Sequence, residues 1–246
     1  MKRLILRARN VLVRLIHLAI KTFWIRGDRV LSGPFEGMLY EGEFRRSASL
    51  PKVLGTYEME LSPILQSAIV SRNYRVFLDI GCADGYFLVG MARAQEDLSV
   101  IGSDISRRAL DKAAVLARRN CVASRVKLVG PCDHQSLNSL IQQDTLLFCD
   151  VEGAEYHLLD PIHCPQLLNT DLIVEVHEFS RPGLGDALIS RFSATHSPTK
   201  IPINYSIRVD HAVRRRFGIP RALWAVATFE MRNSTSHWLY LKRPRQ

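Results

Sequence analysis

The stretch VFLDIGCADGYFLVGM, residues 76–91, constrains the fold of this chain more than any other segment. A β-branched and aromatic run ends at Asp79, a turn with Gly81 and Gly85 follows, and an apolar helical pattern then begins. A strand, a glycine turn and a helix in this order bring backbone N–H groups close to a nucleotide-like ligand. A second strand, SVIGSD, ends at Asp104, where an acidic side chain can accept hydrogen bonds from two ribose hydroxyls.

The residues of the glycine turn distinguish between two classes of cofactor. A dinucleotide fingerprint, G-x-G-x-x-G, uses its second glycine to let the backbone approach a pyrophosphate. Here Ala83 stands in the place of that glycine, and Asp84 adds negative charge where a pyrophosphate would lie. A nicotinamide dinucleotide is therefore disfavoured. S-adenosylmethionine (SAM), which has a ribose, a positive charge and no phosphate, fits better, and an ordinary turn without a ligand is the alternative.

The expected SAM-binding residues belong to the glycine turn and to the ends of the next two strands. Ligands of parallel sheets bind at the carboxyl ends of the strands. The adenine amino group is expected near Asp133 or the backbone of Cys132, although GPCD departs from the usual placement of an acidic residue. The candidates are Asp79, Gly81, Cys82, Ala83, Gly85, Asp104, Ile105, Cys132 and Asp133.

Five segments resemble known methyltransferase families. The segments D-I-G-C-A-D-G (79–85) and S-D-I (103–105) resemble the first two motifs of class I SAM-dependent methyltransferases. FCDVEGAEYHLLDP (148–161) resembles the D-x-E-G-x-E segment of FkbM-type methyltransferases, and LIVEVHEF (172–179) resembles their next strand. HWLYLKR (237–243) resembles a bacterial subgroup of these proteins.

The resemblance runs from about Gly33 to about Glu178, and D-V-E-G-A-E is its most specific part. It implies a Rossmann-like sheet of seven strands and methyl transfer, often to a hydroxyl of a glycan or natural product. It also implies that Tyr57 lies beside the SAM pocket, and a packing role for Tyr57 is the alternative. The acceptor itself is not implied.

Composition limits the remaining possibilities. A length of 246 residues suits one sizeable domain with an appendage. Five cysteines without a C-x-x-C pair argue against a disulfide framework or a zinc site and favour a reducing cytosol. The net charge of +9 comes from the two ends, with +7 in residues 1–31, +7 in residues 207–246 and −5 in residues 32–206. The basic balance is therefore poor evidence for nucleic-acid binding by the core.

Residues 3–25 predict an amphipathic helix. Its polar stripe consists of Arg3, Arg7, Asn10, Arg14, His17 and Lys21, and apolar side chains fill the rest of its surface. The arginines interrupt the apolar run that a transmembrane helix or a signal peptide requires. Two hypotheses stay open. Either residues 1–26 lie on the inner face of the cytoplasmic membrane, with cations at anionic headgroups, or the helix packs on protein.

The rest of the pattern predicts an α/β fold. Residues 31–55 are turn-rich and are expected to form a linker or lid, and Thr56 is expected to cap a helix that ends at Ser71. Strands and helices then alternate, which predicts a mostly parallel sheet with helices on both faces. The expected strands are 75–80, 99–103, 125–129, 145–150 and 172–177, with an antiparallel pair around 204–210 and 238–242. The expected helices are 86–93, 107–119, 134–142 and 155–159. The predicted domains are an appendage, 1–31, and a SAM-binding methyltransferase domain, 32–246.

Four residues at the ends of the fourth and fifth strands are the catalytic candidates: Asp150, Glu152, Glu175 and His177. Glu175 and His177 share one side of their strand, because side chains alternate along a strand. Methyl transfer to a hydroxyl needs an in-line approach and removal of a proton. His177 is the expected base, since its ordinary pKa lies near neutrality, and Asp150 is expected to orient it or the acceptor.

Other interpretations of this cluster stay open. Glu152 and Glu155 also suit a helix N-terminus, and His177 could be a hydrogen-bonded structural residue. A divalent cation on Asp150, Glu175 and His177 is chemically reasonable, but the chain has no dedicated metal motif and no metal is predicted. Four other histidines are expected on the surface or hydrogen-bonded: His157, His163, His196 and His211. The run of arginines at 214–216 is expected to be solvated, and binding of a phosphate on the substrate is the alternative.

The sequence therefore predicts a cytoplasmic SAM-dependent methyltransferase that acts on a hydroxyl of a small molecule or glycan and does not bind nucleic acid. The alternative is a protein with the same fold that has lost its chemistry and works as a membrane-associated binding or assembly factor. The complete set of glycine-turn residues and Asp104 favours the enzyme.

Overall fold

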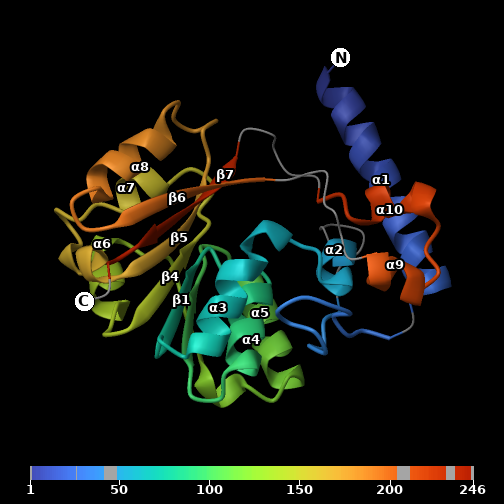
Figure 1. The fold of residues 1–246 in the computed structure, drawn as a ribbon, viewed down its shortest axis with the longest axis horizontal. Helices are drawn as coiled ribbons and strands as arrows, with labels where there is room; N and C mark the ends of the chain where they lie inside the picture. The colour runs from blue at the N-terminus through green and yellow to red at the C-terminus, as the bar shows by residue number, and fades with distance from the viewer. Residues whose placement is uncertain (1, 26, 42–48, 204–210, 231–235, 245–246) are drawn as a thin grey trace. The chain divides into compact units, whose positions relative to one another are not determined.

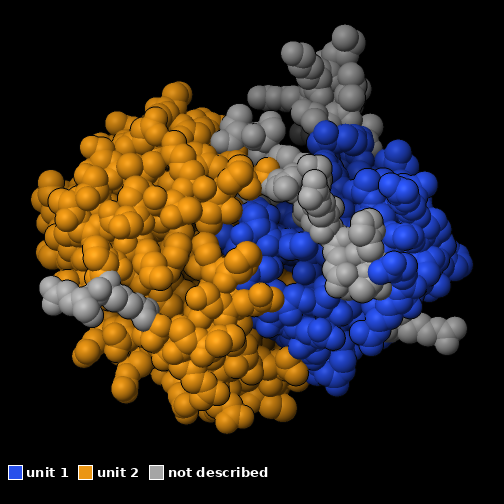
Figure 2. Space-filling view, viewed as in Figure 1, with its two compact units in different colours: residues 1–62, 204–232 blue, residues 63–203, 233–246 orange. Residues whose placement is uncertain are grey.

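The computed structural model describes residues 2–25, 27–41, 49–203, 211–230 and 236–244 (Figure 1). The chain forms two compact units, coloured in Figure 2. The first contains residues 1–62 and 204–232, and the second contains residues 63–203 and 233–246. The predicted domain boundary at residue 31 stays a prediction.

The second unit is built on the predicted seven-stranded sheet. Its strand order is β3-β2-β1-β4-β5-β7-β6. The first five strands run parallel, and β7 is antiparallel to both β5 and β6. The strands are β1 Val76–Ile80, β2 Ser99–Ser103, β3 Val126–Val129, β4 Thr145–Cys149, β5 Asp171–Val176, β6 Ser197–Pro202 and β7 His237–Lys242. The order reverses between β1 and β4, which is where open parallel sheets bind their ligands.

Helices connect the strands, and their starts follow from local capping. Ser106 caps α5 by accepting a hydrogen bond from the Ala109 N–H, and Asp133 and Ser136 form a capping box at the start of α6. The elements of this part are α3 Ser62–Ser71, α4 Tyr86–Ala94, α5 Arg107–Arg119, η2 Ala123–Arg125, α6 His134–Leu140, α7 Glu155–Leu158, η3 Pro165–Asn169 and α8 Leu184–Phe192.

Alternation along the strands gives the sheet two different apolar faces. One face carries aliphatic residues such as Leu78 and Val174 in a cluster with side chains of α6 and α8. The other face carries aromatic rings, with the Phe148 ring centroid 4.7 Å from that of Phe87 on α4 and 5.0 Å from that of Trp238 on β7. Because both faces are covered, the central strands are buried throughout, as expected for a parallel sheet.

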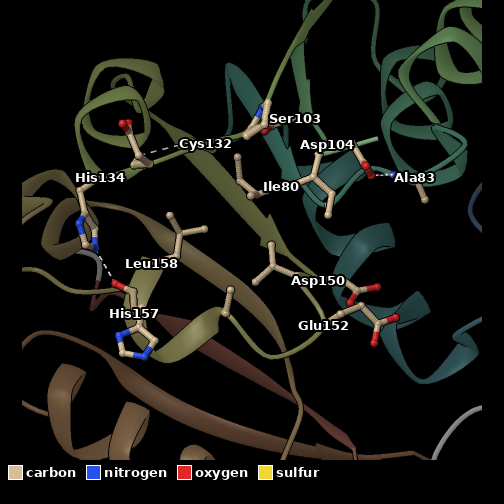
Figure 3. A pocket seen from close by; sticks show the side chains of 16 residues that line it. Ile80, Ala83, Ser103, Asp104, Cys132, His134, Asp150, Glu152, His157 and Leu158 are labelled. Atoms are coloured by element: carbon tan, nitrogen blue, oxygen red, sulfur yellow. Dashed lines mark hydrogen bonds between the residues drawn. The ribbon is translucent and has the colours of Figure 1, made fainter. Parts of the chain in front are cut away.

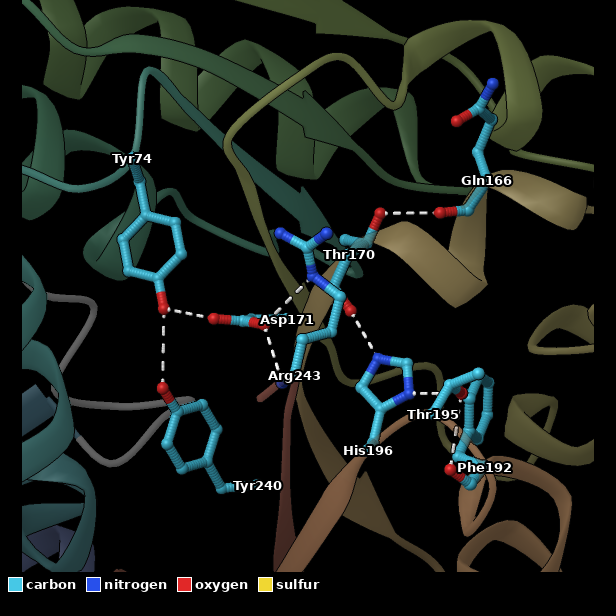
Figure 4. Close-up of polar contacts among 9 residues, drawn as sticks. All are labelled: Tyr74, Gln166, Thr170, Asp171, Phe192, Thr195, His196, Tyr240 and Arg243. Carbon is cyan, nitrogen blue, oxygen red and sulfur yellow. Dashed lines mark hydrogen bonds and ion pairs between the residues drawn. The ribbon is translucent and has the colours of Figure 1, made fainter. Parts of the chain in front are cut away.

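A buried polar network ties β7 to the start of β5 (Figure 4). Asp171 accepts hydrogen bonds from the Tyr74 hydroxyl at 2.7 Å and from the Arg243 backbone N–H at 2.9 Å. Burial, together with contacts to Tyr240 and Asp171, raises the pKa of Tyr74, so its hydroxyl stays a donor. These contacts lie at the amino end of β5, at the edge of the sheet opposite the carboxyl ends, and so hold the scaffold together away from a ligand site.

The segment before β1 differs from its prediction. The predicted helix is present as α3 and ends at Ser71 as expected, but its predicted start after Thr56 is wrong, since η1 covers Met59–Leu61 and α3 begins at Ser62. Glu58 has a φ of 49°, a left-handed conformation that no helix continues through, and Pro63 suits the first turn of α3, where no N–H is needed. The predicted linker 31–55 also contains a helix, α2 Ser49–Leu54.

The antiparallel pair at the edge of the sheet is made by β6 and β7. The predicted strand 204–210 lies outside the described residues. The helix α8 is present although the sequence did not indicate it. The N–H groups of its N-cap residue Gly183 and of its first two residues, Leu184 and Gly185, donate to the Glu178 carboxylate, so a residue five positions before the N-cap satisfies the start of the helix.

The first unit is helical. It contains α1 Lys2–Trp24, α2 and η1, with α9 His211–Arg216 and α10 Arg221–Ala227 from much later in the chain. α1 confirms the predicted N-terminal helix and packs on α10, where His17 Nε2 donates to the Val226 carbonyl at 2.7 Å. Within the described residues, no helix combines the length and the apolar character needed to cross a membrane.

We predict that Gly81→Ala destabilises the protein by about 2–4 kcal/mol. Gly81 has a φ of 87°, and a Cβ atom at this position would lie 1.7 Å from the Asp150 carbonyl oxygen. The matched control is Gly130→Ala, because a Cβ atom there meets nothing within 4 Å. Denaturant unfolding followed by circular dichroism measures both free energies. Equal stability of the two variants would show that the close approach is not a constraint.

Candidate active site

A cavity of about 600 Å³ opens at the carboxyl ends of the parallel strands (Figure 3). It lies where the strand order reverses, and all of its lining residues belong to the second unit. A volume of this size accommodates a nucleoside-sized ligand. The lining residues are Ile80, Gly81, Ala83, Ser103, Asp104, Ile105, Pro131, Cys132, Asp133, His134, Asp150, Val151, Glu152, Ala154, His157 and Leu158.

The Asp104 carboxylate is held in place by two backbone N–H groups. Oδ2 accepts from Ala83 at 2.9 Å and Oδ1 accepts from Ser106 at 2.7 Å. The first contact joins the end of β2 to the glycine turn after β1. Ala83 makes this contact from a left-handed backbone conformation, with a φ of 47°. A carboxylate has about four lone-pair sites, so roughly two remain for hydroxyl donors in the cavity.

The structure places the predicted cofactor residues in two groups. Six of them line the cavity: Gly81, Ala83, Asp104, Ile105, Cys132 and Asp133. Asp79, Cys82 and Gly85 do not line it. Asp79 and Cys82 are buried, and burial raises the pKa of the Cys82 thiol. Gly85 precedes α4 with a φ of 83° and packs against Ala113 of α5. Its role is therefore to let the glycine turn lie close against α5.

Tyr57 belongs to the first unit. The Lys52 ammonium lies 4.8 Å from the centre of its ring, a cation–π contact. A cofactor role for Tyr57 stays a prediction.

Two histidines line the cavity, His134 at the start of α6 and His157 on α7, although the sequence did not assign them to it. His134 Nε2 donates to the His157 carbonyl at 2.5 Å, and the ring of His134 stacks on that of His163 at 4.9 Å. Both His134 and His157 line the cavity, and His157 is exposed, in agreement with its predicted place on the surface. Figure 3 shows this pair at the end of the cavity away from Asp104 and Ala83. The only signal in the sequence was their position just after strand ends.

The Asp133 carboxylate is already engaged at the start of α6. Its Oδ1 atom accepts from the Ser136 N–H at 2.8 Å and from the Ser136 hydroxyl at 2.6 Å. These hydrogen bonds lower the pKa of Asp133. Asp133 therefore serves first as a helix cap, and its remaining lone pairs are what it can offer to a ligand.

His177 lies among four carboxylates just after the end of β5. Its Nδ1–H donates to Glu155 Oε1 at 2.5 Å. Its Nε2 atom lies 3.7 Å from Asp150 Oδ1, 3.6 Å from Glu152 Oε2 and 3.8 Å from Glu175 Oε2. The four predicted catalytic residues are thus together, and Glu155 joins them.

Burial and charge act in opposite directions on His177. Burial lowers the pKa of the imidazole, but the Glu155 hydrogen bond and the charges of Glu175, Glu155 and Glu152 raise it, and the net direction is upward. Glu155 is fully buried and also accepts from the Gly153 N–H at 3.1 Å. Its side chain therefore fixes the tautomer and the orientation of the His177 ring, a role that the sequence did not reveal.

The cluster meets the cavity on one side only. Asp150 and Glu152 line the cavity, whereas Glu175 and His177 do not. The Asp150 carboxylate thus lies between the ligand space and the imidazole. One oxygen each of Asp150 and Glu175 and one nitrogen of His177 also lie within 4.8 Å of one another, a set of donors that suits a divalent cation as well as a proton.

Comparisons with known proteins give a fold. No protein-family profile matches the chain. No curated protein matches it either. Among solved structures, a presumed O-methyltransferase from Klebsiella pneumoniae is similar with a TM-score of 0.51 and 16% identity, over 94% of this chain and 96% of that chain.

Two further solved structures are similar at lower scores. A presumed caffeoyl-CoA O-methyltransferase from Staphylococcus aureus has a TM-score of 0.49 and 10% identity, over 73% of this chain and 81% of that chain. An SAH-bound methyltransferase from Podospora anserina has a TM-score of 0.44 and 19% identity, over 64% and 82%. Together with the strand order, the likeness to the Klebsiella structure shows that this chain has the Rossmann-like fold of methyltransferases.

Proposed function

We propose that this chain is a SAM-dependent methyltransferase that transfers a methyl group to a hydroxyl. The observation that carries the proposal is the Asp104 carboxylate, held by two backbone N–H groups at the edge of a cavity of about 600 Å³. That position suits the two hydroxyls of a ribose. Ala83 and Asp84 beside it disfavour a pyrophosphate. The likeness in fold to a presumed O-methyltransferase supports the same function.

The proposed chemistry divides between the cavity and the His177 cluster. When bound, SAM supplies an electrophilic methyl group. The Asp104 carboxylate would bind the ribose, and the glycine turn would hold the nucleoside. Asp150 lines the cavity and lies 3.7 Å from His177 Nε2. Asp150 orients the acceptor hydroxyl, and the hydroxyl proton passes to His177 Nε2 by way of the Asp150 carboxylate, which lies between the cavity and the imidazole.

Glu155 is a positioning residue in this proposal. Because the carboxylate accepts from Nδ1–H, the proton-accepting position of the neutral ring is Nε2, on the side of Asp150. Glu155 is the last residue of the D-V-E-G-A-E segment, which agrees with an FkbM-like assignment. A glycan or natural-product acceptor, a cytoplasmic location and a membrane contact through residues 1–26 belong to the same proposal.

The second candidate function is a binding or assembly protein that has the same fold but does not catalyse methyl transfer. A cofactor-binding assay followed by a panel of acceptors distinguishes this candidate from the enzyme. Isothermal titration with SAM, with its demethylated product and with NAD tests the cofactor without knowledge of the acceptor. Formation of the demethylated product is then measured on a panel of glycans and hydroxylated small molecules. SAM binding without turnover on any acceptor supports a binding protein, and NAD binding overturns the cofactor assignment.

Asp104→Ala is expected to weaken SAM binding at least tenfold, because two hydrogen bonds to a charged acceptor are worth about 2–4 kcal/mol. Asp104→Asn should be milder, since it keeps one oxygen for Ala83 or the ribose. The matched control is Asp111→Ala, an exposed carboxylate of α5 that pairs with Arg107 at 3.1 Å. Titration calorimetry measures all three. An unchanged affinity in a folded Asp104→Ala protein would remove the ribose contact from the proposal.

His177→Ala and Asp150→Ala should lower turnover by about 10²–10⁴-fold with little change in SAM affinity, because they act on the acceptor and its proton. His163→Ala is the matched control, since its ring is largely exposed and does not line the cavity. Wild-type turnover in both test variants would place the base elsewhere. Loss of activity on adding a chelator, restored by a divalent cation, would assign these residues to a metal site instead.

The pH dependence provides a test of Glu155. The base must be neutral, and the pKa of His177 is raised above its ordinary value of 6.5, so kcat/KM should rise with pH through a pKa above that value. Glu155→Gln keeps an acceptor for Nδ1–H but removes a negative charge. The pKa of His177 should fall, and the rise in activity should move to lower pH.

An NMR titration of the His177 ring gives the same pKa without an acceptor, which keeps the test independent of turnover. The control is Glu96→Gln, an exposed carboxylate that does not line the cavity. If the pKa of His177 is the same in the Glu155→Gln protein as in the control, Glu155 does not act through His177.

A further inference from the structure

The N-terminal helix α1 presents its apolar side to solvent. Among its described side chains, Val13, His17 and Ile20 are buried, and the helix contacts α10 and α2. In the part of the predicted polar stripe whose side chains are described, His17 is fully buried and Asn10, Arg14 and Lys21 are half-buried, so this part lies against protein or at its border. The exposed apolar residues of α1, called the exposed face of α1 below, are Val11, Leu12, Leu15, Leu18 and Phe23.

The exposed face of α1 is a continuous apolar surface. Val11, Leu15 and Leu18 follow one another at helical spacing, and Leu12 lies beside them. Leu12 and Leu15 are 59% and 60% exposed, and Phe23 is 78% exposed. Single apolar residues on a surface are ordinary, whereas a contiguous apolar patch marks a place of contact with a partner or a membrane.

Cations lie along both edges of this face. At 3.6 residues per turn, Arg9 lies on one edge, and Arg14 and Lys21 lie on the other. Arg9 is exposed, with its guanidinium 5.2 Å from the centre of the Phe229 ring. An apolar face bordered by cations is the pattern of helices that lie in the plane of a membrane surface.

The net charge of the protein is confined to the unit that carries α1. The first unit has seventeen Lys and Arg against eight Asp and Glu, which leaves +9. The second unit has sixteen of each and no net charge. An anionic surface therefore attracts the helical unit and not the unit with the cavity, and each cation near an anionic leaflet is worth about 1 kcal/mol.

We propose that the exposed face of α1 docks on an anionic phospholipid bilayer, with the helix in the plane of the surface. α1 has 23 residues and is about 35 Å long at 1.5 Å per residue. A second copy of the chain is a poorer occupant, because it would bring together two units that each carry +9. The inference specifies the membrane contact named in the proposed function, but it does not rest on methyl transfer, since it concerns the first unit alone.

The test uses the full chain and vesicles of phosphatidylcholine, with or without phosphatidylglycerol. Co-sedimentation is expected with the anionic vesicles and at least about tenfold weaker with the neutral ones. Leu15→Asp should weaken binding to anionic vesicles at least about tenfold by placing a charge in the apolar contact. Salt should weaken wild-type binding only in part, because the apolar share is not screened.

The matched control is Val70→Asp on α3, which is 83% exposed and lies outside α1. Both substitutions are at exposed positions, and a thermal melt checks that both proteins are folded. Equal sedimentation of the Leu15→Asp and Val70→Asp proteins overturns the proposal. A wild-type chain that sediments with neither vesicle overturns it too, as does a lipid-free dimer, seen by analytical ultracentrifugation, that Leu15→Asp dissociates.

Discussion

The close approach of two turns at the carboxyl edge of the sheet governs the site. Gly81 follows β1, and its α-carbon comes so near the Asp150 carbonyl, after β4, that a Cβ atom would lie 1.7 Å from it. Its N–H also donates to the Ser103 carbonyl at 2.8 Å, at the end of β2. One glycine thus joins the ends of three strands at the point where the strand order reverses. Because Gly81 has no side chain, the turns after β1 and β4 can approach each other closely beside the cavity. The Asp104 carboxylate, just after the end of β2, lines the same cavity.

The second constraint is electrostatic. Four carboxylates lie within 4 Å of a ring nitrogen of His177, and two of them, Glu155 and Glu175, are buried. Like charges at this separation are unfavourable in a medium of low dielectric constant. A proton on the imidazole relieves the repulsion, which is why the pKa of His177 is raised in spite of burial. A divalent cation would relieve it in the same way, so the arrangement that makes His177 a proton acceptor also makes the cluster a candidate cation site.

The sequence predicts the sheet well, because the relevant signals are local. The strand ends and α5 follow from apolar runs bounded by glycine, aspartate and serine. The signals that fail are tertiary. Glu155 and His177 are 22 residues apart and meet only because α7 begins beside the end of β5. One missed signal is local: the start of α8 depends on the side chain of Glu178, which lies five residues before Gly183 and not at the usual N-cap position. The predicted helix start after Thr56 is wrong because Glu58 takes a left-handed conformation, which the sequence did not reveal.

The N-terminal helix shows a related limit of the amphipathic pattern. The periodicity of residues 3–25 defines a polar and an apolar side, but it does not say which side meets protein. α10, about two hundred residues later, supplies a backbone carbonyl for His17 and so takes up part of the polar side. The apolar side is then left in water, which is unfavourable by about 25 cal/mol per Å² of apolar area. Packing of α1 on α10 therefore leaves an apolar surface in water, and a partner that covers this surface stabilises the protein. The +9 charge of the same unit favours an anionic partner.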